Sequence, residues 1–95
     1  MNATVTKAIS AIGETFPHGF EDTVVFDIMD VGQVTLDRSG VRSGGQSASL
    51  TISADAETFA GIINGKLDPI SLYLSGQISV SGNLGIAAKL AQRLR

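Results

Sequence analysis

A single histidine limits the acid–base and nucleophilic chemistry open to this chain, which also has no cysteine. A catalytic triad needs a nucleophile oriented by a base such as histidine. His18 stands between Pro17 and Gly19, a setting typical of a loop. We interpret His18 as a solvated loop residue and predict that the chain is not an enzyme.

The acidic residues offer little for a metal ion, which needs several converging His, Asp or Glu ligands. Asp27 and Asp30 fall on opposite faces of a predicted strand, and Glu21 and Asp22 form a short pair just before it. We interpret all four as surface charges that protect the strand edge. The sequence predicts no metal and no other cofactor.

A glycine-rich stretch at residues 42–46, Arg-Ser-Gly-Gly-Gln, has backbone amides that could wrap a phosphate. It lacks the Gly-x-x-x-x-Gly-Lys-Ser/Thr pattern of a phosphate loop, and no strong helical run follows it. We favour a plain hairpin loop.

Basic residues gather near the C-terminal end, where Lys89, Arg93 and Arg95 fall in the last turns of a predicted helix. Cations there complement the helix dipole, each contributing about 0.3 to 1 kcal/mol. The alternative is that Lys89 and Arg93 contact an anionic lipid head group or a membrane surface. Both interpretations stay open at this point.

The spacing of apolar residues predicts the elements that position these side chains. Over residues 4–16 the apolar positions recur every three or four residues, as on one face of a helix, and Pro17 ends the pattern. Residues 23–31 change to a period of two, and residues 33–37 continue it after a turn. We expect a helix followed by an antiparallel hairpin.

The rest of the chain alternates between the same two patterns. Residues 38–47 are rich in Gly and Ser and predict a loop with a short edge strand at Val41. The further elements predicted are a strand at 48–52, a helix at 55–65 capped by Ser53 or Asp55, a helix at 69–75, a strand at 77–81 and a helix at 83–94. The expected class is α+β, with a largely antiparallel sheet covered by helices on one face.

Composition excludes several classes of function. The 95 residues are 43% hydrophobic and 17% charged, with a net charge of -2, and we expect one domain spanning residues 1–95. Without a broad basic surface, the chain is not expected to bind nucleic acid. No apolar run approaches the roughly 18 residues of a membrane-spanning helix, and the N-terminus lacks a signal-peptide pattern. We expect a soluble, cytoplasmic protein.

Several short motifs follow one another in the second half of the chain. Residues 49–53 predict a strand before a capped helix, and Phe59 stands where that helix would have an aromatic anchor. Asn-Gly-Lys-Leu-Asp-Pro at 64–69 predicts a turn, and residues 72–85 run through an apolar helix, a glycine, an alternating strand and a Gly-Asn-x-Gly segment. In this order the motifs resemble the sterol carrier protein-2 (SCP-2) sterol-transfer family, and in particular its small stand-alone prokaryotic-type members.

This resemblance implies about five mostly antiparallel strands, covered on one face by helices and enclosing an apolar tunnel. Members of the family bind sterols, fatty acids, fatty acyl-CoA esters or phospholipids, and some carry lipids for quinone biosynthesis. The last strand of the family is often basic, whereas Gln77, Ser79 and Ser81 are neutral here. This difference weakens the expected attraction to anionic membranes and acyl-CoA head groups.

The apolar side chains would form an ordinary packed core by default, but the resemblance favours a ligand cavity between the sheet and the helices. Small alanines on the last predicted helix also favour a hollow. The residues predicted to line this cavity are Phe26, Ile28, Leu36, Leu50, Ile52, Phe59, Ile62, Ile63, Leu67, Ile70, Leu74, Ile78, Leu84, Ala87, Ala88 and Ala91.

Two functions are compatible with these patterns. The first is a non-catalytic carrier that binds and transfers one apolar lipid, such as a fatty acid, a fatty acyl-CoA, a sterol or a phospholipid or quinone precursor, with transient contact to a membrane. The alternative is a structural interaction module, a homodimer or the partner of a separate enzyme, whose cavity is filled. A cavity smaller than about 300 Å³ would favour the alternative.

Overall fold

The computed structural model describes residues 3–94, which form four helices and a five-stranded sheet. In chain order the elements are α1 (Ala3–Thr15), β1 (Val24–Ile28), β2 (Gly32–Asp37), β3 (Gly40–Ser43), β4 (Leu50–Ala54), α2 (Ala56–Ile63), α3 (Pro69–Leu74), β5 (Ser79–Gly82) and α4 (Leu84–Arg93).

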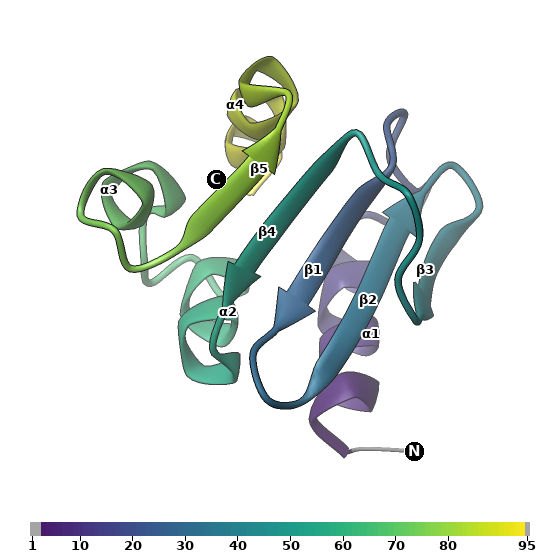
Figure 1. Cartoon of the computed structure of the whole chain (residues 1–95). Helices are drawn as coiled ribbons and strands as arrows, with labels where there is room; N and C mark the ends of the chain where they lie inside the picture. Colours follow the sequence, from purple (N-terminus) through teal and green to yellow (C-terminus); the bar gives the residue numbers. More distant parts are fainter. Residues whose placement is uncertain (1–2, 95) are drawn as a thin grey trace.

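The strands lie in the order β3-β2-β1-β4-β5 (Figure 1). β1 pairs with β2 in antiparallel and with β4 in parallel orientation, while the two outer pairs, β2 with β3 and β4 with β5, are antiparallel. The sheet is therefore mixed but mostly antiparallel, and the predicted α+β class is confirmed.

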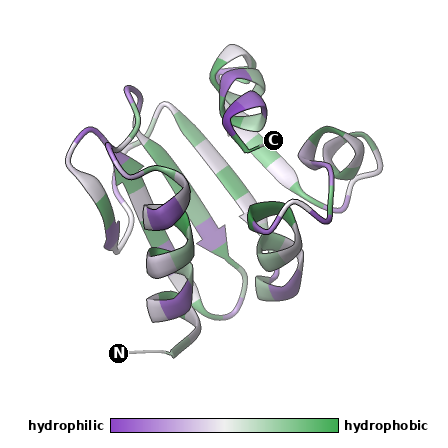
Figure 2. Cartoon of the chain, turned by 180° about the vertical axis from the view of Figure 1, so that it is seen from behind, coloured by the Kyte–Doolittle hydropathy of each residue, from purple (hydrophilic) through white to green (hydrophobic). Residues whose placement is uncertain are grey.

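The helices cover one face of this sheet, as Figures 1 and 2 show from opposite sides. Every second side chain of β1 points toward the helices. These side chains are Val24, Phe26 and Ile28, and each is at most 2% exposed. They lie in the main hydrophobic cluster together with Leu36 of β2 and Leu50 of β4. Period-two alternation therefore places the core between the sheet and the helices.

The chain between β3 and β4 crosses the other face. β3 and β4 run in the same direction with two strands between them, so this connection passes in front of the sheet in Figure 1. The hydroxyl of the buried Thr35 donates a hydrogen bond to the carbonyl oxygen of Gly44 at 2.7 Å. The backbone N–H of Ser49 donates to the carbonyl oxygen of Thr23 at 3.0 Å. These bonds satisfy polar groups under the crossing segment.

Several element boundaries differ from those predicted. β1 ends at Ile28 rather than at residue 31, because Asp30 takes up a positive φ of 63° in the hairpin turn. β4 begins at Leu50 and extends to Ala54, because residues 48 and 49 still belong to the crossing segment. Asp55, not Ser53, caps α2, and its side chain accepts a hydrogen bond from the Thr58 N–H at 2.8 Å.

Candidate functional site

A cavity of about 250 Å³ lies between the β4–β5 half of the sheet and the helices α2, α3 and α4. Apart from the Tyr73 hydroxyl, every lining side chain is a hydrocarbon. The lining residues are Phe26, Ile52, Phe59, Ile62, Ile63, Pro69, Ile70, Tyr73, Ile78, Val80, Leu84, Ala87, Ala88, Leu90, Ala91 and Leu94. Such a surface offers a ligand dispersion contacts and exclusion of water, but no charged group.

Strand register builds the floor of the cavity. Phe26 of β1 pairs with Ile52 of β4, which in turn pairs with Val80 of β5. Side chains in register on neighbouring strands project from the same face, so these three stand in a row beneath the helices.

The wall formed by α4 is lined partly by small side chains. Ala87, Ala88 and Ala91 face the cavity at helical spacing. The helix begins after Asn83, whose side-chain oxygen accepts hydrogen bonds from the N–H groups of Gly85 at 2.8 Å and Ile86 at 3.3 Å. This cap fixes where the alanine wall starts.

The cavity opens where α3 approaches the start of α4. Ile70, Tyr73 and Leu84 line it and are also 44%, 41% and 54% exposed. Asp68 caps α3 by accepting a hydrogen bond from the Ile70 N–H at 3.2 Å, and Pro69 occupies the first turn. Half-exposed side chains that also face the hollow mark its mouth.

The structure divides the sixteen predicted cavity residues into groups. Eleven line the 250 Å³ cavity, namely Phe26, Ile52, Phe59, Ile62, Ile63, Ile70, Ile78, Leu84, Ala87, Ala88 and Ala91. Ile28 lines a different cavity, between α1 and α2. Leu36 and Leu50 are fully buried among core side chains, and neither lines one of these two cavities.

Two further residues of that set lie outside the cavity. Leu67 is 40% exposed and covers Gly61, where a side chain would collide with it. Leu74 is 78% exposed on α3.

The lining residues not predicted are Pro69, Tyr73, Val80, Leu90 and Leu94. Helical spacing was a usable signal for three of them, since Tyr73, Leu90 and Leu94 each follow a predicted residue, Ile70, Ala87 or Ala91, by three positions.

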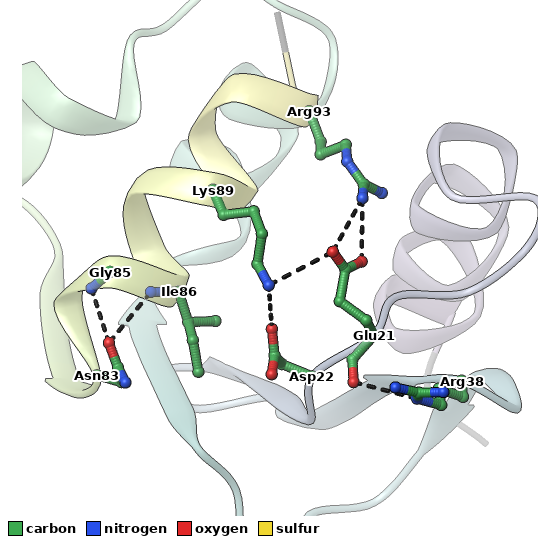
Figure 3. A network of polar contacts seen from close by, with 8 residues as sticks. All are labelled: Glu21, Asp22, Arg38, Asn83, Gly85, Ile86, Lys89 and Arg93. Atoms are coloured by element: carbon green, nitrogen blue, oxygen red, sulfur yellow. Dashed lines mark hydrogen bonds and ion pairs between the residues drawn. The ribbon is translucent and has the colours of Figure 1, made fainter.

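The two basic residues singled out on α4 lie in an ionic cluster (Figure 3). The Lys89 ammonium lies 2.6 Å from a carboxylate oxygen of Asp22 and 3.4 Å from one of Glu21. The Arg93 guanidinium donates to both carboxylate oxygens of Glu21 at 3.0 and 3.1 Å. Both cations also stand over the ring of Phe20, 5.5 and 5.4 Å from its centre. α4 is thereby held against the segment before β1.

The cluster changes the acidity of its members. The pKa of Glu21 lies below its ordinary value, because its carboxylate accepts a hydrogen bond from its own backbone N–H and is further stabilised by Lys89 and Arg93. The pKa of Lys89 is raised, first by its hydrogen bond to Asp22 and then by Glu21. Lys89 and Arg93 thus have carboxylate partners within the protein. Their contact with a lipid head group stays a prediction. Arg95 lies outside the described residues.

The other residues considered for chemistry do not converge. Within residues 3–94 no three His, Asp or Glu side chains come close enough to hold a metal ion. His18 is exposed in a turn. Arg42 in the glycine-rich stretch forms a two-pronged ion pair with Asp37 at 2.8 and 3.1 Å, and donates to Gln46. None of the helices formed by residues 3–94 is long and apolar enough to span a membrane.

A hydrocarbon-lined cavity between a sheet and its helices can shield the apolar chain of a lipid from water, which is the chemistry of lipid-binding proteins as a class. Comparison with known proteins places the chain within that class. The model of the SCP-2 sterol transfer family matches residues 14–95, and the chain belongs to this family. Members of the family bind and transfer lipids.

Individual relatives agree with this assignment. The chain is 31% identical over 74 residues to human sterol carrier protein 2, a match that covers 78% of the chain and 13% of that protein. The curated relatives that it matches are much longer, and the matches span between 11% and 14% of their length.

Solved structures show the same fold. The solution structure of sterol carrier protein domain 2 of Helicoverpa armigera superposes with a TM-score of 0.77, at 22% identity, over 100% of this chain and 91% of that one. Sterol carrier protein-2 of Aedes aegypti, in complex with the C16 fatty acid palmitate, superposes with a TM-score of 0.82. That match has 14% identity and covers 99% of this chain and 96% of the other.

Proposed function

We propose that this chain is a non-catalytic, cytoplasmic carrier that takes up one apolar lipid chain in the 250 Å³ cavity and delivers it to a membrane or an enzyme. The observation that supports the proposal is the lining between the sheet and the helices, which is hydrocarbon apart from the Tyr73 hydroxyl at the mouth. Burial of an acyl chain contributes about 0.8 kcal/mol per methylene, so shape and apolar contact suffice for binding.

Substitution of Ala88 by Phe tests the location of the ligand. Ala88 lines the cavity from α4 and is exposed at its rim, so a larger side chain enters the hollow without displacing buried atoms. If the Ala88→Phe ring excludes two methylenes, the loss is about 1.6 kcal/mol, and palmitate affinity falls about tenfold. The measurement is isothermal titration calorimetry with palmitate, together with native mass spectrometry.

The matched control is Leu74→Ala. Leu74 is 78% exposed and does not line the cavity, so this variant removes apolar surface of the same molecule without filling the hollow. Its palmitate affinity should equal that of the unaltered chain. A folded Ala88→Phe protein that binds palmitate normally would contradict the proposed site.

A second candidate, a dimeric or partner-binding module, is favoured by two observations. The cavity of about 250 Å³ is below the roughly 300 to 1,000 Å³ usual for ligand pockets. In addition, Ile70, Tyr73 and Leu74 expose apolar surface on one short helix. Light scattering separates the candidates, because an interaction module would form a dimer that Leu74→Ala weakens, and would bind no palmitate.

A further inference from the structure

A second cavity, of about 460 Å³, lies between α1 and α2 on the same face of the sheet. The two helices contact one another, and Figure 2 shows both in front of the sheet. The floor of this cavity consists of Phe26 and Ile28 from β1 and Phe59 from α2, all of which are at most 7% exposed. The bottom of the cavity is therefore apolar.

Alanines on the facing walls explain why the helices leave this space open. Ala8 and Ala11 are three positions apart on α1, and Ala56 and Ala60 are four positions apart on α2. Residues at these spacings share one helix face, so each helix presents small side chains to the other. The resulting volume is within the range of small-molecule sites.

An aromatic partition separates this cavity from the 250 Å³ cavity. The two share only Phe26, Phe59 and Ile63 in their linings. The rings of Phe26 and Phe59 meet edge to face, with centres 5.7 Å apart and planes at 80°. Both rings are buried, so the pair forms a packed wall with one cavity on each side.

Two side chains of opposite charge stand at the rim. Lys7 of α1 and Glu57 of α2 both line the cavity and both are exposed, and the amide of Asn64 lines it as well. The ion pairs formed among residues 3–94 include neither Lys7 nor Glu57. The rim thus offers a cation and an anion that do not neutralise each other directly.

We propose that this second cavity binds a single-chain amphiphile with a zwitterionic head group. The acyl chain lies over Phe26, Ile28 and Phe59, the anionic part of the head group faces Lys7, and its cationic part faces Glu57. A head group with both charges fits a rim with both charges, whereas a simple carboxylate would gain from Lys7 and be repelled by Glu57. This site is separate from the cavity of the proposed function and stands without it.

The test uses the whole chain and dodecylphosphocholine, kept below its critical micelle concentration so that monomers bind. Ala60→Leu fills the second cavity from an exposed position with a good helix former, and should lower the affinity at least tenfold. Ala88→Phe fills the other cavity and should lower the affinity for dodecylphosphocholine much less than Ala60→Leu does. Lys7→Gln and Glu57→Gln should each weaken binding by about three- to fivefold, as for exposed charge pairs.

Matched controls identify the contribution of each charge. Lys66→Gln removes an exposed lysine that lines neither cavity and should have no effect. Lauric acid, which has the same chain length and only a negative charge, should bind more tightly to Glu57→Gln than to the unaltered chain.

In the unaltered chain, dodecylphosphocholine should shift the amide NMR signals of Ala8, Ala11 and Ala60, a readout that needs no variant.

Three outcomes would overturn the proposal. The unaltered chain binds no dodecylphosphocholine, or Ala88→Phe abolishes binding while Ala60→Leu does not, or both charge substitutions leave the affinity unchanged. Palmitate binding that survives in Ala60→Leu would show at the same time that the carrier function does not depend on this site.

Discussion

At the scale of single residues, the contacts that hold α4 in place are charged and lie outside the cavity. The carboxylate of Glu21 forms ion pairs with both Arg93 and Lys89, and Lys89 forms a second ion pair with Asp22. Pairs this exposed contribute little individually, but several charges around the Phe20 ring form a network with defined geometry. The network stabilises the helix that supplies the alanine wall.

This network should make stability depend on pH at the acid end. Because the folded pKa of Glu21 is below its unfolded value, its contribution is fully present above the ordinary glutamate range. The contribution is lost as the pH falls through the folded pKa. The difference in Tm between the unaltered chain and Glu21→Gln should therefore be positive near neutral pH and approach zero well below about pH 4.

The control for this prediction is Glu14→Gln, which removes an equal charge from α1. Glu14 takes part in none of the ion pairs formed among residues 3–94. Its Tm difference should stay small at every pH. High salt should reduce the Glu21→Gln difference, and a difference that persists unchanged at about pH 3 would show that Glu21 acts through packing rather than charge.

At the scale of elements, the junction between β5 and α4 decides how the cavity is closed. Gly82 ends β5 with φ of 115°, and Asn83 caps the next helix. A Cβ at position 82 would collide with the carbonyl oxygen of Ser49, which itself accepts a hydrogen bond from the Asn83 N–H at 3.0 Å. Only glycine lets the chain turn this close to β4.

Gly82→Ala should therefore destabilise the protein by about 2 kcal/mol, since it combines a strained φ with a steric collision. Gly40→Ala is the matched control, because Gly40 has a similar φ of 109° but a Cβ added there would meet no atom within 4 Å. Gly40→Ala should cost about 1 kcal/mol from backbone strain alone. Urea unfolding midpoints measure both, and equal losses would mean that the collision is relieved by a shift of β4.

At the scale of the whole molecule, the centre of the sheet and the mouth of the cavity differ in how firmly they are held. β1 is paired on both sides, by β2 and β4, and its apolar residues are almost fully buried. α3 has six residues, of which Leu72 is buried while Ile70, Tyr73 and Leu74 are exposed. Local opening is expected first where few apolar groups are buried, and α3 borders the mouth.

Hydrogen exchange should reflect this gradient. The amides of α3 should exchange much faster than those of β1 in the unliganded protein. Saturation with palmitate should slow α3 and α4 while leaving β3 unchanged, because α3 and α4 border the proposed site and β3 does not. At a ligand concentration of about 100 Kd the free energy of unfolding should also rise by about 2.7 kcal/mol. Slowing that is uniform over all strands and helices, β3 included, would argue against α3 as the entrance.

Local patterns predicted much of this protein from its sequence. Helices, strands and caps depend on residues within one turn or one strand pair, so the order of elements and Asp55, one of the two caps predicted for α2, follow from spacing and residue type. The ordered motifs of residues 48–94 were also sufficient to indicate the SCP-2 family, which the family match confirms.

Only the tertiary structure decided which of the apolar residues are packed, which line a cavity and which are exposed. Leu50 is fully buried, Ile70 stands at a cavity mouth and Leu74 is 78% exposed, although all three have similar hydrophobicity. Likewise, Arg93 meets Glu21 across 72 positions of the chain. Such contacts depend on how the chain path brings distant segments together, and no short-range pattern of residues records that path.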